Sequence, residues 1–461
     1  MKALRDPDRL LADGLAAIRA QYRVPPAFPP EVQAAAQEAA RRAPSAHADW
    51  TGRPFVTLDP AGATDLDQAF AIEPAGVDYL LHYAIADVAW FVDDDGPLDR
   101  EAWARGVTTY LPDGKAGLYP PVLAEGAASL LPDGPRAAVV FTTRIAPDGG
   151  AVLAGVQRAV IRSRAKLAYE TVADDDLPPG FVEIARRIAA AEDHRGAARV
   201  DPPEQEVERD AQGRFELRFR PLLPSEKRNA ALSLATNMAV ADLLQANRTG
   251  LFRVMAAPEP RAEARLRLTA KAFGMDWPAA APLAQFEKTL DPLDPRHGAS
   301  MLAVRRAGQG ASYVPRRAWQ TPWHAAMAAT YAHATAPLRR LADRYVVRAA
   351  LAVASGQEVP EAVRAAFERL PAVMDKAEAR SGQIERAAID LAETAILAHR
   401  TGEEFDAVVT DLGETGARIQ LCDLPVVARV AANGTIPGAA VRVRLESADP
   451  ARRTLAFKHT A

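Results

Sequence analysis

The spacing of hydrophobic positions changes along the chain, and each change predicts a different kind of structure. Residues 1–50 hold two stretches with helical spacing, LLADGLAAIRAQY and PPEVQAAAQEAARRA, on either side of a proline-rich break. Pro29 and Pro30 suit the start of the second helix, because proline is tolerated in a first turn. We expect a small helical module here. It is either a helix-turn-helix or winged-helix-like unit or an extension packed on the next domain.

Residues 51–160 are rich in short apolar runs typical of strands, such as RPFVTLD and RAAVVFTTRIA, with Gly, Pro and Asp turns between them. From about residue 226 apolar residues recur every three to four positions, which predicts helices, the longest from EAVRAAFERL through AETAILAHR. The end of the chain returns to strand-like runs. The order predicts an α+β protein, with strands and then helices over 51–398 and strands again over 402–461.

Composition places the chain among ordinary globular proteins, with 49% hydrophobic and 25% charged residues. Its one cysteine, Cys422, excludes an intrachain disulfide and a cysteine-based zinc site. The N-terminus lacks the apolar core of a secretory signal, and no apolar run is long enough to cross a membrane. We therefore expect a cytoplasmic protein without a membrane partner.

The formal net charge of −3 means that any binding of nucleic acid would depend on local groups of Arg and Lys. One such group is Arg339, Arg340, Arg344 and Arg348. The alternative interpretation is that these arginines form the solvated faces of Ala/Arg-rich helices.

The stretch TLDPAGATDLDQAF carries the clearest candidate chemistry. Asp59 ends a predicted strand, and Asp65 and Asp67 follow it in a D-x5-D-x-D pattern. Carboxylates held together repel one another unless a cation neutralises them, and oxygen ligands favour Mg²⁺ or Mn²⁺ over zinc or copper. Aspartates in a DPAG turn are also common for local hydrogen bonding. The loop alone therefore leaves a metal site and a simple turn as alternatives.

A series of segments in fixed order resembles the ribonuclease II/R (RNB) family over roughly residues 50–398. They are the acidic loop, AIADVAWFV, LDREAWARGVTTYLP, YPPVLAEGAASLLPD, SRAKLAYE, RGAARVDPPE, YAHATAPLRRLADRYVVR and QIERAAIDL. The following stretch, with GEEFDAVVTDLGETGARIQL and IPGAAVRVRLESAD, resembles an S1-type RNA-binding barrel, a relative of the OB fold. The resemblance implies that residues 51–398 form one domain of β-sheets packed with a helical half and that residues 402–461 form a small β-barrel.

The resemblance implies a 3′-to-5′ exoribonuclease, a monomer that hydrolyses single-stranded RNA to nucleoside 5′-monophosphates with two Mg²⁺ (or Mn²⁺) ions. It implies metal ligands at Asp59, Asp65, Asp67 and Gln68. It also implies catalytic roles for Asp65, Asp67 and Arg339, with the arginine gripping the scissile phosphate. The RNA contacts that it implies are Tyr110, Tyr169, Glu385, Arg340 and Arg418.

Two departures from the family pattern matter here: the first leaves a second function open, and the second concerns base stacking in the barrel. Gln68 stands where the family has the last aspartate of its cluster, so it offers a carbonyl oxygen without a charge. In the barrel, Ala417 and Arg418 stand where an aromatic residue usually stacks on a base. The alternative function is a catalytically weakened RNA-binding protein of the same fold. Single residues have plainer interpretations too: a surface salt bridge for Arg339 or Glu385, and core packing for the two tyrosines.

Overall fold

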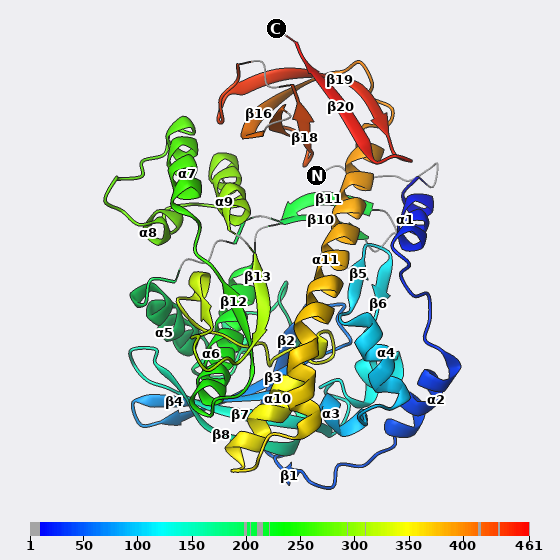
Figure 1. The fold of residues 1–461 in the computed structure, drawn as a ribbon, viewed down its shortest axis with the longest axis vertical. Helices are drawn as coiled ribbons and strands as arrows, with labels where there is room; N and C mark the ends of the chain where they lie inside the picture. The colour runs from blue at the N-terminus through cyan, green and yellow to red at the C-terminus, as the bar shows by residue number, and fades with distance from the viewer. Residues whose placement is uncertain are drawn as a thin grey trace.

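The structure is a computed structural model that describes residues 10–197, 201–202, 204–209, 215–220, 222–292, 294–308, 310–413, 416–431 and 434–460. Figure 1 shows a large mixed body with a small β-barrel at one end, joined by helix α11, which runs along the molecule up to the barrel. The α+β class and the order of strands, helices and barrel are confirmed. The first nine residues of the predicted N-terminal module lie outside the described ranges.

A seven-stranded sheet forms the β half of the large body. In spatial order its strands are β1 (Ala48–Asp49), β8 (Ala151–Ile161), β7 (Arg136–Ile145), β4 (Asp78–Ala86), β3 (Gln68–Ala75), β2 (Phe55–Asp59) and β9 (Ser163–Ala168). Apolar residues such as Phe70, Tyr83 and Phe141 are fully buried, and β3, β4 and β7 each bury several consecutive residues, which explains the apolar runs of this region.

The parallel pairing of β2 with β9 decides where the acidic loop lies. Asp59 pairs with Ala168, so both strands end at the same edge of the sheet. The chain then crosses from β2 to β3 through residues 60–67, and β3 begins at Gln68. Tyr169, the residue after β9, is consequently placed beside Asp59 and donates its backbone N–H to the Asp59 carbonyl oxygen at 3.1 Å.

Helices cover the sheet and extend the body beyond it. They are α3 (Val88–Phe91), α4 (Pro97–Arg105), α5 (Phe181–His194), α6 (Pro224–Ala246), α7 (Pro260–Ala272), α8 (Leu283–Glu287), α9 (Pro295–Ala307), α10 (Leu341–Ala354) and α11 (Glu361–Leu397). Helix α6 packs against α5, α10 and strand β8, so its apolar positions complete the main core. Short hairpins and turns lie between these helices: β5 (Thr109–Leu111) with β6 (Gly114–Ala116), and the turn η1 (Leu123–Ala127).

The predicted helical half also contains strands that its pattern did not reveal. Strands β12 (Leu251–Met255), β13 (Ala311–Pro315), β14 (Trp323–His324) and β15 (Ala329–Thr330) form a small sheet there. Ahead of the helical half, β10 (Glu204–Arg209) pairs with β11 (Phe215–Arg220). Each of these strands has two to six residues. Runs that short carry too few alternations to distinguish a strand from an irregular segment.

The N-terminal helices pack on the large body. Helix α1 (Leu10–Gln21) buries Leu11, Leu15 and Ile18 against α11, in a core of its own with the β10–β11 hairpin. Helix α2 (Pro30–Ala39) joins the main core and packs on α4. Because the two helices belong to different cores, the arrangement favours an extension of the large domain over an independent helix-turn-helix unit.

The C-terminal barrel has five antiparallel strands in the spatial order β18 (Val427–Val430), β17 (Gly416–Leu421), β16 (Glu404–Gly413), β19 (Ala440–Asp449) and β20 (Thr454–His459). It has its own apolar core, which also includes Leu397 from the last turn of α11. Contacts between β18 and β20 nearly close the barrel, as the predicted OB fold requires.

Candidate active site

The acidic loop is held in a fixed shape by polar contacts from the surrounding body. The Lys166 ammonium on β9 donates hydrogen bonds to the carbonyl oxygens of Ala61 and Ala63, at 2.8 and 2.5 Å. Further along the loop, the Leu66 N–H donates to the Ser129 hydroxyl at 2.9 Å, and the Leu66 side chain is fully buried. The loop is therefore an ordered platform rather than a simple surface turn.

Asp59 and Asp67 are the most enclosed carboxylates of this loop. Burial raises the pKa of Asp59 to about 6, with Asp65 raising it too and Arg339 and Lys166 opposing the rise. Burial raises the pKa of Asp67 to about 7, against the lowering effects of Arg339 and the Leu338 N–H. Both groups would be stabilised as carboxylates by additional positive charge.

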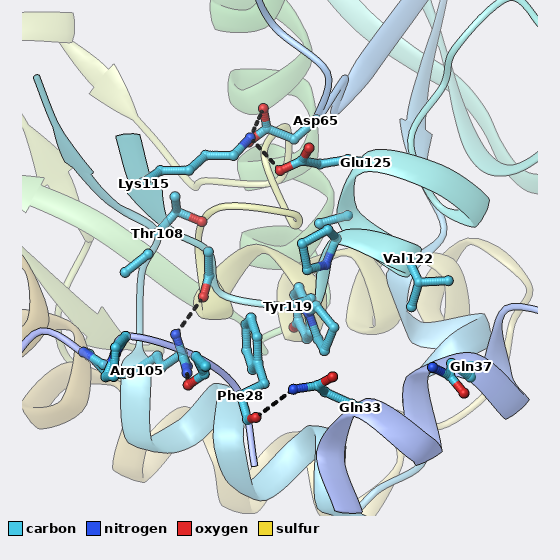
Figure 2. A pocket seen from close by; sticks show the side chains of 18 of the residues that line it. Phe28, Gln33, Gln37, Asp65, Arg105, Thr108, Lys115, Tyr119, Val122 and Glu125 are labelled. Carbon is cyan, nitrogen blue, oxygen red and sulfur yellow. Dashed lines mark hydrogen bonds and ion pairs between the residues drawn. The ribbon is translucent and has the colours of Figure 1, made fainter. Parts of the chain in front are cut away.

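Asp65 is held on both of its oxygens by the β5–β6 hairpin. The Lys115 ammonium lies 2.7 Å from Asp65 Oδ1, and the Tyr110 hydroxyl donates to Oδ2 at 3.4 Å. Lys115 is also 3.1 Å from Glu125 Oε1, as Figure 2 shows. Burial opposes the charge of Lys115, but hydrogen bonds and charge attraction from Asp65 and Glu125 raise its pKa overall.

Arg339 lies in the tight turn before α10, facing the acidic loop. Its Nε is 3.5 Å from Asp67 Oδ2, and its side chain remains 49% exposed. The Leu338 N–H donates to Asp67 Oδ1 at 2.7 Å, and the Thr108 N–H donates to the Arg339 carbonyl oxygen at 3.0 Å. The turn thus links the acidic loop to the strand that carries Tyr110. The Arg339 guanidinium remains half exposed, so it can donate hydrogen bonds to an anion.

The other arginines of this motif have structural roles. Arg340 forms a two-pronged ion pair with Asp343, at 2.8 and 2.9 Å. Arg344 is 1% exposed and pairs with Asp99, while Arg348 pairs with Asp94. The interpretation of a solvated helix face is therefore wrong for Arg344. The RNA contact predicted for Arg340 does not fit a guanidinium that is already bound to Asp343.

The two predicted tyrosines differ in exposure. Tyr110 is 50% exposed, so its alternative role as core packing is excluded by the structure. Tyr169 is half-buried, and its hydroxyl accepts a hydrogen bond from the Asn229 amide at 2.7 Å. Burial raises the pKa of both hydroxyls, with Asp65 adding to the rise for Tyr110 and Asp59 for Tyr169, so both remain protonated donors.

The Gln68 amide oxygen, predicted to bind a metal, is hydrogen-bonded to other side chains instead. It accepts hydrogen bonds from the buried Tyr83 hydroxyl at 2.5 Å and from the Ser233 hydroxyl at 3.1 Å. These neutral partners on β4 and α6 take up the oxygen that a metal would need. The assignment of Gln68 as a metal ligand therefore does not fit this arrangement.

Glu385 and Arg418 lie in a different cavity from the acidic loop. That cavity has a volume of about 680 Å³ and is formed by α9, α11, β10, β11 and the barrel. It is rich in arginine, with Arg305, Arg306, Arg386, Arg418, Arg429 and Arg453 in its lining. The acidic-loop aspartates do not line it, so the structure separates the predicted site into a carboxylate centre and an arginine-rich approach.

A family model described as "RNB domain" matches residues 47–356, and one described as "RNase II-type exonuclease C-terminal S1 domain" matches residues 403–460. The chain belongs to the RNB family. This membership confirms the resemblance inferred from the motifs.

Relatives within the RNB family support the fold across the whole chain. Ribonuclease R of Aquifex aeolicus is 27% identical over 434 residues, which cover 87% of this chain and 60% of the relative. The structure of Mycoplasma genitalium RNase R in complex with ribose-methylated single-stranded RNA matches with a TM-score of 0.85 and 18% identity, covering 100% of this chain and 79% of that one. Yeast Ssd1, described as a pseudonuclease, matches with a TM-score of 0.68 and 18% identity, covering 96% of this chain and 57% of that one. The fold therefore occurs in proteins with and without nuclease activity.

The residues of this RNB centre fit a hard divalent cation in kind. Asp59 Oδ2 is buried and has no hydrogen-bond partner within the described ranges, so it is an oxygen donor available to a cation. In those same ranges no three or more His, Cys, Asp or Glu side chains are grouped as a metal-binding cluster. The buried Asp59 oxygen is the kind of donor that Mg²⁺ takes, because Mg²⁺ is usually held by one or two carboxylates together with substrate phosphates and water.

Sequence reasoning gave no role at the centre to several residues that shape it: Lys115, Glu125, Lys166, Asn229 and Ser233. No short-range pattern marks them, since each contacts a partner that is distant in sequence. Arg339 and Tyr110 were found because their motifs are contiguous. In the described part of the chain, no helix is long and apolar enough to cross a membrane.

Proposed function

We propose that the protein is a 3′-to-5′ exoribonuclease that hydrolyses single-stranded RNA to nucleoside 5′-monophosphates with the help of Mg²⁺. The observation that carries this proposal is the convergence of Asp59, Asp65 and Asp67 with the half-exposed Arg339 at one edge of the sheet. Carboxylates for a cation and a free guanidinium for a phosphate are the two requirements of phosphodiester hydrolysis. The chain spans 60% of the length of its Aquifex relative, so the relative's name alone does not carry the activity.

Each residue has a separate part in the proposed reaction. Asp59 and Asp67, with Asp65 beside them, would hold Mg²⁺, which would supply an activated water and neutralise developing negative charge. Arg339 binds the non-bridging oxygens of the scissile phosphate and orients it for attack. Water adds to phosphorus, and the bond to the 3′-oxygen of the preceding nucleotide breaks. That oxygen leaves with a proton as the new 3′-hydroxyl, and the terminal nucleoside keeps the phosphate on its 5′-oxygen.

Two tyrosines hold the end of the strand in this proposal. The exposed ring of Tyr110 offers a face on which a base can stack, while its hydroxyl lies near Asp65. The Tyr169 hydroxyl, fixed by Asn229, lies next to Asp59 and can donate to the terminal ribose. Stacking and phosphate contacts do not depend on base identity, which suits digestion of any sequence.

The arginine-rich cavity between α11 and the barrel is the proposed approach for RNA. Its arginines can follow the phosphate backbone, although the chain is acidic overall. The solved M. genitalium relative in complex with single-stranded RNA has the same fold, which supports this arrangement. In this proposal Glu385 and Arg418 act on the incoming strand rather than at the carboxylate centre.

The test is digestion of oligo(A) labelled at its 5′ end. The full chain is incubated with Mg²⁺, and in a parallel reaction with EDTA. A metal-dependent ladder that shortens from the 3′ end, with nucleoside 5′-monophosphate as product, supports the proposal. The same oligonucleotide with a 3′-phosphate distinguishes an exonuclease from an internal cut. Products of random length from the start of the reaction would contradict the exonuclease assignment.

A catalytically weakened RNA-binding protein is the second candidate. The observation that favours it is Gln68, whose neutral network with Tyr83 and Ser233 replaces a carboxylate of the family pattern. Tight binding of oligo(A) without any ladder, in both Mg²⁺ and Mn²⁺, would establish this candidate in place of the enzyme.

A further inference from the structure

Fixed protein cations already accompany the aspartates of the acidic loop. Lys115 lies 2.7 Å from Asp65, and Arg339 lies 3.5 Å from Asp67. Arg339 and Lys166 also act electrostatically on Asp59. Protein cations therefore already neutralise part of the charge of the three aspartates, and a metal ion is needed only by an aspartate whose charge they leave uncompensated.

Lys115 lies where a cation shared by two carboxylates would lie. Its ammonium lies between Asp65 Oδ1 at 2.7 Å and Glu125 Oε1 at 3.1 Å, and the Thr64 hydroxyl donates to the other oxygen of Glu125 at 3.0 Å. Figure 2 shows the lysine reaching along the top of a cavity of about 370 Å³ to this pair of carboxylates. An ammonium is a compact charge with three donors, so it can satisfy two carboxylates at once.

The hairpin fixes that ammonium in place. Lys115 is the direct cross-strand partner of Tyr110, and the two side chains hold the two oxygens of Asp65. Neighbouring side chains on paired strands keep a constant spacing. The lysine is therefore part of the same rigid element as the tyrosine.

Asp59 presents the opposite situation. Its Oδ2 is buried and has no hydrogen-bond partner within the described ranges, so it can still serve a cation. Gln68 adds no charge, and its oxygen is occupied by Tyr83 and Ser233. One divalent ion held by one or two carboxylates and the substrate phosphate needs no larger cluster of ligands.

We infer that this centre takes one divalent cation, on the Asp59 side, and that the Lys115 ammonium occupies the place of a second one at Asp65. The inference rests on the proposed function and specifies its metal requirement. Lys115 neutralises Asp65 permanently, while water activation is left to the single ion.

Counting bound Mn²⁺ tests the inference without relying on activity. EDTA-washed full chain is titrated with Mn²⁺, and free Mn²⁺ is measured by its electron paramagnetic resonance signal. We expect one ion per wild-type chain and one in Lys115→Arg, which keeps the charge. We expect a second ion in Lys115→Met, because Asp65 and Glu125 are then both free to bind it. Lys288→Met, which removes a lysine paired with Asp193 at 2.8 Å elsewhere, is the matched control and should bind one.

Magnesium dependence of the cleavage rate gives a second reading. The wild-type rate should follow a single-site curve in Mg²⁺, and Lys115→Met should require a higher concentration and follow a steeper, two-site curve. Two ions in an active wild-type protein, or one ion in a folded Lys115→Met, would overturn the inference and leave the proposed function standing. Absence of both Mn²⁺ binding and RNA cleavage in the wild type would overturn the proposed function as well.

Discussion

Two Asp–Arg–Tyr clusters in this protein come from neighbouring parts of the chain but differ in the exposure of their side chains. One is Asp67, Arg339 and Tyr110 at the acidic loop, and the other is Asp99, Arg344 and Tyr119 beneath α10. The aspartate is buried in both, at 6% and 4% exposure. The arginine and tyrosine are about half exposed in the first cluster and no more than 1% exposed in the second.

In the second cluster the aspartate is enclosed by three hydrogen-bond donors. Asp99 accepts hydrogen bonds from Arg344, from the Tyr345 hydroxyl at 3.1 Å and from the Asp95 N–H at 2.9 Å. In the first cluster Arg339 approaches Asp67 at 3.5 Å, and its side chain is 49% exposed. Removing one partner of a buried ion pair destabilises the fold because it leaves a buried charge unpaired, whereas a half-exposed arginine can bind a ligand. Identical residue types therefore predict opposite effects of substitution.

The aspartates should give the largest contrast. Asp67→Asn keeps the shape of the side chain and removes its charge, so we expect turnover to fall by about 1,000-fold with RNA binding nearly unchanged. Asp99→Asn should instead lower the free energy of unfolding and leave the single-turnover rate of the folded fraction near wild type. Single-turnover kinetics, filter binding and chemical denaturation measure the three quantities. Near-normal turnover in Asp67→Asn would remove it from the catalytic centre.

Substitution of the arginines should give the next largest contrast between the two clusters. Arg344→Met leaves Asp99 buried without its partner and should cost about 3–5 kcal/mol of stability. Arg339→Met should cost little stability and reduce turnover by about 100-fold, since one preorganised contact to the transition state is lost. Adding Asp99→Leu to Arg344→Met should restore much of the stability, because no buried charge then remains unpaired. Equal effects of the two arginine variants on stability would refute the distinction between a structural Arg344 and a ligand-binding Arg339.

The exposed tyrosine should control where digestion stops. Tyr110→Ala removes a stacking face worth about 1–3 kcal/mol per base, so short strands should dissociate earlier and the limit product should be several nucleotides longer. Tyr110→Phe keeps the ring and should give the wild-type limit product. Complete digests run on a sequencing gel compare the three proteins. A wild-type limit product from Tyr110→Ala would assign the stacking role to another residue.

Removal of the hydroxyl of the buried Tyr119 should have the smallest effect, and only on stability. The Tyr119 hydroxyl accepts a hydrogen bond of 3.4 Å from Arg344 in the closed cluster. Tyr119→Phe should therefore lower stability by about 0.5–1.5 kcal/mol and leave the limit product unchanged. Thermal or urea unfolding measures the loss. A longer limit product from this variant would show that the two clusters are coupled rather than separate.

The sequence predicts the framework of this centre well because its signals are local. The strand that ends at Asp59, the loop to Asp67 and the turn with Arg339 each lie within one contiguous motif. The parallel pairing of β2 with β9, which places Tyr169 beside Asp59, is not determined by the motif of either strand. Such non-local pairing is the part of a fold that a local pattern cannot determine.

The sequence does not predict the direction in which individual side chains point. Arg339 and Arg340 are adjacent and chemically identical, yet one faces the acidic loop and the other pairs with Asp343. Gln68 was assigned to the metal by its position in a motif, while its amide points to Tyr83. Lys115 contacts Asp65 from fifty residues away because the β5–β6 register places it there. These outcomes depend on packing in three dimensions, and each changed the interpretation of the site.

Gly106 joins the strand that carries Tyr110 to the turn that carries Arg339. Its carbonyl oxygen accepts the Leu341 N–H at 3.0 Å, and Val107 forms a bridge with Arg340. Its φ of +72° and the 2.6 Å separation between a Cβ built at this position and the Ala377 Cβ leave room for glycine alone. The strand that carries Tyr110 and the turn that carries Arg339 are thus directly joined. In the proposed reaction an RNA strand would move forward by one nucleotide past these two residues without changing their spacing, so we expect the rate of stepping to depend on how fast the RNA dissociates from them.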